Sequence, residues 1–388
     1  MKITHIHIEK FRGFQNEDFE VGSLLTAIAG QNGTQKSTLL GIITQTFTLK
    51  TDDSMRVEKP LCGGSYISAF KDKFRLSPTF DRPKGHEWTI SFDTGMDDFT
   101  VESIKRAGDP NVRFWKKGAR QEGDGYISFP TIFLSLKRLV PAAEEAKIIT
   151  DDTLLTQEEL NEFKQLHNKI LIAQTPISSA TTITSKNKQS IGVSTEIYDW
   201  NQNSMGQDNL GKIILALFSF RRLQDKYPQQ YKGGILAIDE MDATMYPASQ
   251  VELLKVLRKY ASNLNLQIIF TTHSISLLKA MDDLVQEVAK KAETANQAKI
   301  LYLKKVNDKI AIKQGVNFKG IQLDLNVVAE GNNRKKNKIT TYTEDKENIL
   351  FVRAILKSKA FVLNFVDVTL PCSTLMELVT KKVPAFIY

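Results

Sequence analysis

Apolar and polar residues alternate at the start of the chain, and a nearly unbroken apolar run follows. Residues 2–8 alternate with a period of two, which predicts a strand with one buried face. Residues 24–29 are apolar almost throughout and lead into a glycine-containing loop at 30–38, where a helical pattern begins at Ser37. This order predicts a buried strand, a tight loop and a helix, which is the usual setting of a phosphate-binding loop.

A second series of apolar segments begins after residue 203. Residues 210–223 and 249–260 have helical spacing, and each precedes a short apolar run, at 235–239 and 267–271. Apolar strands that alternate with helices indicate a parallel sheet covered on both faces. Two further segments within 299–313 are expected to close this region as a hairpin.

The middle of the chain has a different pattern. Residues 86–103 and 125–137 contain alternating strands, which suit an antiparallel sheet. Region 141–195 is interpreted as a short helical insertion, since Thr156–Glu159 is a capping box and apolar residues recur after it at helical spacing. A Ser/Thr-rich stretch, 178–185, follows. This insertion is expected to make dimer contacts, although a plain surface excursion fits the pattern equally well.

Composition narrows the class of protein. The chain has 388 residues, more than one hydrophobic core usually holds, so two or more domains are expected. No apolar stretch is long enough to span a membrane, and with only Cys62 and Cys372 neither a disulfide framework nor a thiolate zinc site is expected. These features favour a soluble, cytoplasmic protein. The net charge of +8, with a basic run at 334–338, suits a polyanion partner but also plain surface lysine.

The loop at 30–38 has the chemistry of a nucleotide-phosphate site. Its backbone N–H groups can surround phosphates, a lysine can contact the β- and γ-phosphates, and a serine can bind Mg²⁺. The usual glycine before the lysine is replaced by Gln35, which either strains the loop or reaches the nucleotide; a degenerate loop that binds weakly is the alternative. The ATP-binding candidates here are Gly30, Asn32, Gly33, Gln35, Lys36, Ser37 and Thr38.

Two later strand ends carry the residues expected to act on the bound phosphate. Asp239 and Glu240 follow four apolar residues, so Asp239 is expected to hold Mg²⁺ and Glu240 to polarise the attacking water as general base. His273 follows the next strand and should emerge at the same sheet edge, where it is expected to sense the γ-phosphate. About two hundred residues separate Lys36 from this acidic pair, which favours an ATPase divided by an insertion over a compact GTPase-like domain.

A shorter motif precedes the helix at 210–223. Segment 203–207 resembles a reduced signature loop of ABC-type ATPases. In that class the serine and the glycine contact the γ-phosphate held by the other subunit, so the resemblance implies ATP-binding roles for Ser204, Gly206 and Gln207. It also implies a dimer with ATP sandwiched between its subunits.

Together these segments resemble the ABC/SMC-like ATPases of the overcoming-lysogenization-defect (OLD) family and its relatives in bacterial defence systems. The opening segment 6–14 looks like that group's first strand and turn, and segments 239–243 and 271–274 fit as well. The resemblance implies ATP and Mg²⁺ as cofactors and a homodimer or higher oligomer. It also implies a nucleic-acid partner, mainly DNA, with a defence effector or retron nucleic acid as further partners and no membrane.

The tail looks like the opening of a Toprim domain, the metal-dependent nuclease fold that OLD proteins carry after their ATPase. The resemblance implies that Glu344 is a catalytic, metal-binding glutamate and Glu347 a helper. Glu344 also fits an ordinary exposed acid after a strand. A Toprim site further needs an Asp-x-Asp pair on the next strand, and the sequence reaches Tyr388 where that strand is expected to begin. Either the natural protein continues, which is the favoured expectation, or this domain is a dimer or partner surface.

The expected fold class is α/β, an ABC/SMC-like mixed sheet covered by helices with a helical insertion, followed by the beginning of a Toprim α/β domain. The expected regions are an ATPase lobe with the phosphate-binding loop (1–140), the insertion (141–195), a lobe with the signature, acidic pair and histidine (196–330) and a partial Toprim-like domain (339–388). The expected function is ATP hydrolysis that controls a DNA endonuclease in anti-phage defence.

Two alternatives remain open. One is a scaffold that binds ATP without turnover and sequesters or presents an effector. The other is a DNA-repair ATPase of the SMC branch, which would carry a long coiled-coil arm; region 141–195 is too short for one.

Overall fold

A computed structural model of the chain describes residues 1–66, 70–77, 79–105, 112–118, 125–140, 147–151, 154–185, 189–330 and 339–381. They belong to two compact units, Met1–Gln322 and Leu323–Tyr388, and each unit is described by itself. The basic run at 334–338 and the final apolar run at 383–388 lie outside the described residues.

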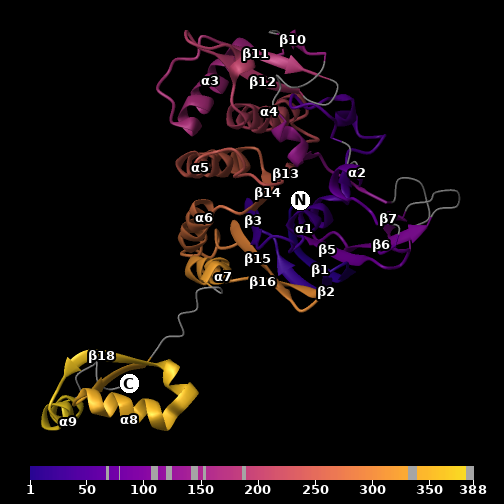
Figure 1. Cartoon of the computed structure of the whole chain (residues 1–388). Helices are drawn as coiled ribbons and strands as arrows, with labels where there is room; N and C mark the ends of the chain where they lie inside the picture. Colours follow the sequence, from indigo (N-terminus) through magenta and orange to yellow (C-terminus); the bar gives the residue numbers. More distant parts are fainter. Residues whose placement is uncertain are drawn as a thin grey trace. The chain divides into compact units, whose positions relative to one another are not determined.

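A six-stranded sheet forms the centre of the first unit (Figure 1). Four neighbouring pairs of its strands are parallel, and the strand at one edge is antiparallel. The interior strands read as continuous apolar runs because both faces of the sheet are covered. This confirms the expected mixed α/β fold with a helix-covered sheet. Across the sheet, the order is β16 (Lys309–Lys313), β15 (Ala298–Val306), β3 (Leu25–Gly30), β14 (Leu266–Thr272), β13 (Gly234–Ile238) and β9 (Thr131–Leu134).

Strand β9 corrects one expectation. Residues 125–137 were expected to join an antiparallel sheet, but Thr131–Leu134 pairs in parallel with β13 at the edge of the core sheet. Ile132 and Leu134 are buried, and the backbone N–H of Asp239 donates to the Leu134 carbonyl at 3.0 Å. Four residues are too few for their periodicity to distinguish the two kinds of strand.

Helices cover one face of the core sheet. A second sheet covers the other face, and helix α1 packs between the two sheets. Ile28 and Ile269 share a hydrophobic cluster with Trp88 of the second sheet and with apolar residues of α1. The alternate residues Ile268 and Phe270 are equally buried and point to the opposite face, where α5 and α6 lie (Figure 1). The helices are α1 (Lys36–Thr44), α2 (Phe70–Lys73), α4 (Met205–Lys226), α5 (Pro247–Asn263), α6 (Ile275–Val288) and α7 (Phe318–Glu330), with short 3₁₀ turns η1 (Ser54–Val57), η2 (Leu136–Leu139) and η4 (Trp200–Gln202).

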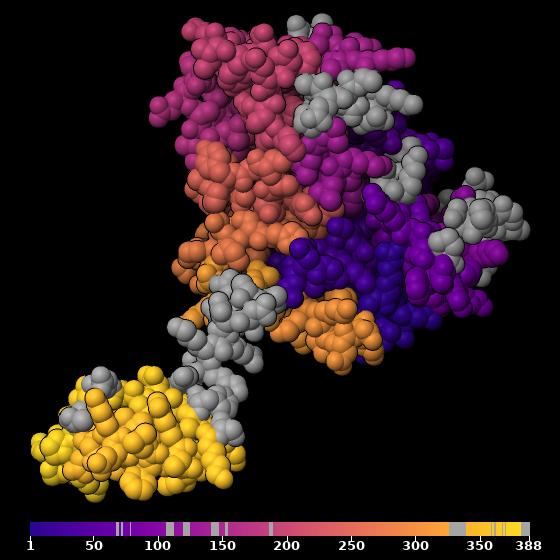
Figure 2. Space-filling view, in the orientation of Figure 1, coloured from indigo at the N-terminus to yellow at the C-terminus, as the bar shows by residue number. Residues whose placement is uncertain are grey.

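The second sheet is antiparallel and starts at the N-terminus. Its first hairpin turns at Arg12 and Gly13, and the Gly13 carbonyl accepts from the backbone N–H of Ile310 at 2.8 Å. The β15–β16 hairpin, orange in Figure 2, therefore lies against the indigo start of the chain. The order is β2 (Phe14–Glu20), β1 (Ile3–Phe11), β5 (Glu87–Phe92), β6 (Phe99–Lys105) and β7 (Val112–Lys116); β4 (Phe47–Thr48) and β8 (Ile127–Ser128) form a separate short pair.

The inserted region contains the expected helix and also a sheet that was not expected. Helix α3 (Gln157–Leu171) begins at the capping box of Thr156 and Glu159, which is confirmed. Three antiparallel strands accompany it, so the description of 141–195 as helical is incomplete. The Ser/Thr-rich stretch forms one of them because its Thr and Ile side chains suit a pleated, half-buried surface. The strands are β10 (Ile149–Asp151), β11 (Ser179–Thr184) and β12 (Gln189–Ser194).

The second unit has a parallel two-stranded sheet with a helix in the crossover. Its elements follow the order expected for the tail: β17 (Ile339–Thr343), α8 (Lys346–Leu356), η5 (Lys357–Val362), β18 (Leu363–Thr369) and α9 (Cys372–Thr380). Leu350, Phe351 and Ile355 on α8 are each at least 66% exposed. Helix α8 therefore presents an apolar stripe on its outer face.

None of the helices in the described part of the chain combines the length and the apolar character needed to cross a membrane.

Candidate functional site

The phosphate-binding loop joins β3 to α1 as the sequence predicts. Gly30 and Gly33 have φ angles of 151° and 79°, which glycine adopts readily. Lys36 is 8% exposed, and its Nζ donates to the carbonyls of Gly30 at 3.0 Å and Gln31 at 2.9 Å. An ammonium group has three donors, so one remains for a ligand held in the loop. Burial lowers the pKa of Lys36, and nearby carboxylates, Glu240 foremost, oppose this shift.

Gln35 occupies the position of the usual glycine in a left-handed conformation. It is the N-cap of α1 with φ 61° and makes no side-chain capping bond. Its amide nitrogen lies 3.0 Å from where a Cβ on Gly13 would sit, so the side chain packs at the β1–β2 turn. The left-handed conformation explains why glycine is usual here, and the side chain's direction explains how glutamine is accommodated.

Asp239 joins three loops through one carboxylate. It is 6% exposed, and its Oδ1 accepts from Ser37 Oγ and from Thr271 Oγ1, both at 2.8 Å. Thr271 Oγ1 also accepts from the backbone N–H of Glu240 at 2.6 Å. The ends of β13 and β14 and the start of α1 therefore meet at one point, as the order of parallel strands predicted.

These oxygens have the chemistry that Mg²⁺ requires. Mg²⁺ takes oxygen ligands at about 2.0–2.1 Å in an octahedron, so neighbouring ligands lie roughly 2.9 Å apart. The 2.8 Å between Ser37 Oγ and Asp239 Oδ1 matches two neighbouring corners. Ser37 and Asp239 therefore fit the Mg²⁺ that accompanies a bound nucleotide.

Glu240 and His273 lie beside this cluster. Glu240 is half-buried and has a φ of 50°, a left-handed conformation that turns the chain sharply after β13. The backbone N–H of His273 donates to the Asp242 carboxylate at 3.3 and 3.4 Å. Partial burial lowers the pKa of His273, and the charge of Lys36 lowers it further. The imidazole is therefore neutral at neutral pH.

The signature residues form the first turn of α4, earlier than the expected helix start. Ser204 is the N-cap, and its side chain exchanges capping bonds with Gln207. A Cβ on Gly206 would lie 2.5 Å from the Thr244 carbonyl, so this turn packs tightly on the loop after Glu240. Among the described contacts, the signature residues meet this loop and Tyr198 but not the phosphate-binding loop.

Sequence reasoning missed four polar residues around the site. Arg12 donates twice to the Asp81 carboxylate, at 3.0 and 2.9 Å, and once to Thr38 Oγ1 at 3.4 Å. Arg138 and Asn209 form a buried pair at 2.7 Å behind Glu240. Arg12 belongs to the turn segment that the family resemblance already included, whereas no motif indicated the others.

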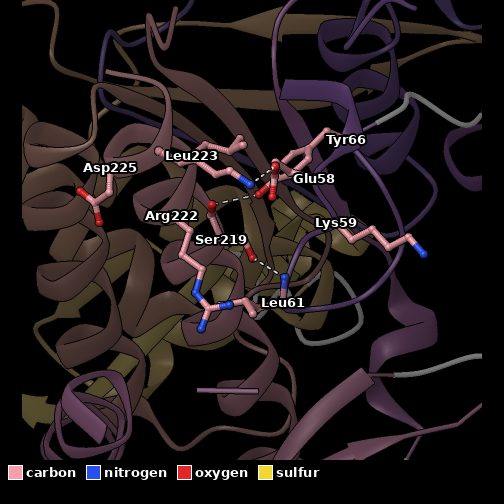
Figure 3. Close-up of a pocket in the computed structure, with 9 residues that line it drawn as sticks. Glu58, Lys59, Leu61, Tyr66, Ser219, Arg222, Leu223 and Asp225 are labelled. Atoms are coloured by element: carbon pink, nitrogen blue, oxygen red, sulfur yellow. Dashed lines mark hydrogen bonds and ion pairs between the residues drawn. The ribbon is translucent and has the colours of Figure 1, made fainter. Parts of the chain in front are cut away.

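A pocket of about 470 Å³ lies away from these loops, between residues 58–66 and the C-terminal turns of α4 (Figure 3). Two of its charged groups pair with each other, Lys226 with Glu58 at 2.6 Å. The Arg222 guanidinium is bound to Glu159. These ion pairs engage Lys226 and Arg222, whereas Lys59 is a further cation among the lining residues.

Glu344 follows β17 directly, and its carboxylate accepts from the backbone N–H of Cys372 at 3.3 Å. It is exposed. Within the described ranges, no three His, Cys, Asp or Glu side chains are grouped as a metal site.

Comparison with known proteins points to the same chemistry. Residues 135–278 match a family described as an AAA ATPase domain, a span that holds the signature, the acidic pair and the histidine but not the phosphate-binding loop. Among curated proteins, no sequence matches this chain significantly.

Solved structures of SMC head domains are similar in fold. The head domain from Thermotoga maritima is 14% identical and covers 81% of this chain and 100% of its own, with a TM-score of 0.44. A head bound to the C-winged helix domain of ScpA is 14% identical and covers 83% and 100%, with a TM-score of 0.48. The head from Pyrococcus furiosus bound to the C-terminal domain of ScpA is 13% identical and covers 84% and 99%, with a TM-score of 0.43.

Likenesses at these TM-scores carry no weight by themselves. The assignment rests on the family match and on the meeting of the phosphate-binding loop, Asp239 and Thr271 at one sheet edge. The first unit of this chain holds an ATPase domain.

Proposed function

We propose that the chain binds Mg²⁺–ATP and hydrolyses it. The observation that carries this proposal is the single carboxylate of Asp239, which accepts from Ser37 of the phosphate-binding loop and from Thr271 of the neighbouring strand end. This contact fixes the spacing between the loop that would hold phosphates and the strand ends that would act on them.

Each residue has a separate role in this mechanism. Lys36, anchored by two loop carbonyls, directs its remaining N–H at the phosphates. Ser37 and Asp239 would hold Mg²⁺, which would neutralise charge on the phosphate oxygens when bound. Glu240 takes a proton from the attacking water, and neutral His273 donates a hydrogen bond to the γ-phosphate.

The site is proposed to be completed by a second copy of the chain arranged head to tail. Ser204 and Gly206 then contact the nucleotide held by the partner. Exposed apolar side chains lie near the signature residues and near the loop after Glu240. Met205 and Tyr246 are 42% and 48% exposed, and Ile197 is 80% exposed. Covering them in a dimer removes apolar surface from water.

ATP turnover is proposed to control a metal-dependent endonuclease of OLD type in anti-phage defence, as in retron-like systems. The β17–α8–β18 crossover, with Glu344 directly after β17, supports a Toprim-like unit whose acid binds metal. The nuclease site requires further acids that the described residues do not group with Glu344. Duplex DNA is the proposed substrate, attracted by the net charge of +8.

A measurement of phosphate release from ATP in the presence of Mg²⁺ tests the ATPase proposal. Glu240→Gln should lower turnover roughly 100-fold or more while ATP still binds, and Lys36→Met should weaken binding. Glu293→Gln, an exposed acid outside the site, is the matched control and should behave as the parent. ATP binding without turnover in the parent protein would replace the ATPase with a nucleotide-gated scaffold.

Cleavage of supercoiled plasmid, with and without ATP, tests the nuclease proposal separately. Glu344→Gln should abolish metal-dependent nicking, and Glu377→Gln, an exposed acid on α9, should not. Equal nicking by both variants would remove Glu344 from the mechanism.

A further inference from the structure

One buried arginine lies directly behind the proposed general base. Arg138 in η2 is 2% exposed, and its Nη2 donates to the Glu240 carbonyl at 2.8 Å. Its Nη1 donates to the carbonyls of Leu134 and Ser135, at 3.3 and 3.1 Å. The guanidinium therefore joins the end of β9 to the loop that follows β13.

Asn209 extends this contact to the signature helix. It is fully buried in the second turn of α4, and its Oδ1 accepts from Arg138 Nε at 2.7 Å. Its Nδ2 donates to the Ala243 carbonyl at 3.0 Å. One amide thus bonds both to the arginine and to the far end of the loop that the arginine supports.

The loop between these two contacts is conformationally strained. Glu240 and Thr244 have φ angles of 50° and 69°, a region that side chains other than glycine rarely occupy. Such conformations persist where surrounding bonds fix them. Arg138 and Asn209 supply those bonds, because they hold the carbonyls of Glu240 and of Ala243.

The charge of the arginine is also unusual. The four oxygens that Arg138 contacts are three carbonyls and one amide oxygen, not carboxylates. Burial lowers the pKa of Arg138 to about 10, and the carboxylates beyond it, Asp239 foremost, act in the opposite direction. The group is therefore still charged at neutral pH, where a neutral hydrogen-bonding residue would avoid the desolvation cost.

We infer that Arg138 and Asn209 are a positioning pair that makes the Glu240–Thr244 loop and the first turns of α4 move as one body. Glu240 acts on the nucleotide of its own subunit, whereas Ser204 and Gly206 serve the nucleotide of the partner. The pair therefore couples the two sites of the proposed dimer. The kinetic consequence of this inference rests on the proposed ATPase activity. The mechanical coupling of the loop to α4 is independent of that activity.

Hydrogen exchange without nucleotide tests the coupling directly. In Asn209→Ala and Arg138→Lys, amide exchange should rise at least several-fold in both 204–212 and 240–246. The double variant should exchange faster than Arg138→Lys, which leaves the bond from Asn209 to the Ala243 carbonyl in place. Its increase should be smaller than the sum of the two single effects, because both variants break the bond between Arg138 and Asn209. Tyr231→Phe, which removes a buried hydrogen bond to the Leu264 carbonyl at 2.8 Å elsewhere in the unit, is the control and should leave both segments unchanged.

Steady-state kinetics gives the second readout. Both single variants should lower kcat about 10- to 100-fold with KM for ATP within about threefold, because the nucleotide loop is intact but the base is misplaced. Faster exchange in only one of the two segments would overturn the inference. If the parent protein turns over ATP, a kcat of the two variants no lower than that of Tyr231→Phe would overturn it as well. If the parent protein does not hydrolyse ATP, only the ATPase proposal fails. The hydrogen-exchange result then decides whether the loop and α4 are coupled.

Discussion

Acid should destabilise the first unit through one histidine that is buried without a partner. His167 on α3 is 2% exposed and packs on Phe163, with ring centroids 5.8 Å apart. Neither ring nitrogen has a hydrogen-bond partner among the described groups. Burial lowers the pKa of His167 to about 4; the nearby Asn168 amide opposes this shift slightly without bonding to the ring.

The size of the effect follows from linkage. In the unfolded chain the histidine binds a proton near its ordinary pKa of about 6.5, whereas in the folded chain it stays neutral until about pH 4. The unfolded state therefore holds more protons in this window, and the free energy of unfolding falls as pH drops from about 6.5 to 4. A difference of about 2.5 pKa units corresponds to about 3 kcal/mol, all of it present above pH 6.5.

Urea unfolding at about pH 7.5, 6 and 4.5, followed by circular dichroism, measures this slope. His167→Leu keeps an apolar group of similar size and removes the titration, so its free energy of unfolding should fall less with acid than that of the parent, by about 2–3 kcal/mol. Tyr231→Phe, which removes a buried hydrogen bond elsewhere in the unit and leaves every histidine in place, should parallel the parent. Parallel pH dependences for His167→Leu and the parent would refute the reasoning.

Three further predictions concern the nucleotide site. Gln35→Gly should relieve about 1 kcal/mol of left-handed strain and keep ATP affinity within about threefold by calorimetry; a tenfold loss would mean that the side chain contacts nucleotide. Gly206→Ala puts a Cβ 2.5 Å from the Thr244 carbonyl, so turnover should fall at least about tenfold although ATP binding persists; unchanged turnover would contradict tight packing there. The pKa of His273 is lowered, but both the neutral and the protonated ring donate a hydrogen bond, so protonation of this histidine below about pH 6.5 should not by itself lower turnover at saturating ATP; an acid limb that disappears in His273→Asn would contradict the hydrogen-bond role.

The loop at 30–38 and the ends of β13 and β14 could be placed from the sequence because each signal is local. A short apolar run that ends in a loop or an acid reports a buried parallel strand, and parallel strands bring their C-terminal ends to one edge. That rule placed Asp239 and Glu240, whereas the residue types of the loop at 30–38 indicated Lys36. The meeting of Ser37, Asp239 and Thr271 needed only the order of neighbouring strands.

The remaining parts depend on contacts that no local pattern encodes. Strand β9 lies beside β13 although about a hundred residues separate them, and its four residues carry no distinctive period. The pairing of β11 with β12 arises from a polar Ser/Thr sequence whose buried face shows only after folding. Arg138 and Asn209 are ordinary polar residues in sequence, and burial behind the acidic loop is what gives them a role.

The loop from Asp239 to Thr244 is the element through which these parts act together. On one side it is held by Ser37 of the phosphate-binding loop and by Thr271, which both donate to the Asp239 carboxylate. On the other side it is held by Arg138 of η2 and by Asn209 of α4. A strained segment fixed at both ends cannot shift at one end without straining the bonds at the other. We therefore expect a change at the phosphate site to be transmitted to α4, the helix proposed to face the partner's nucleotide.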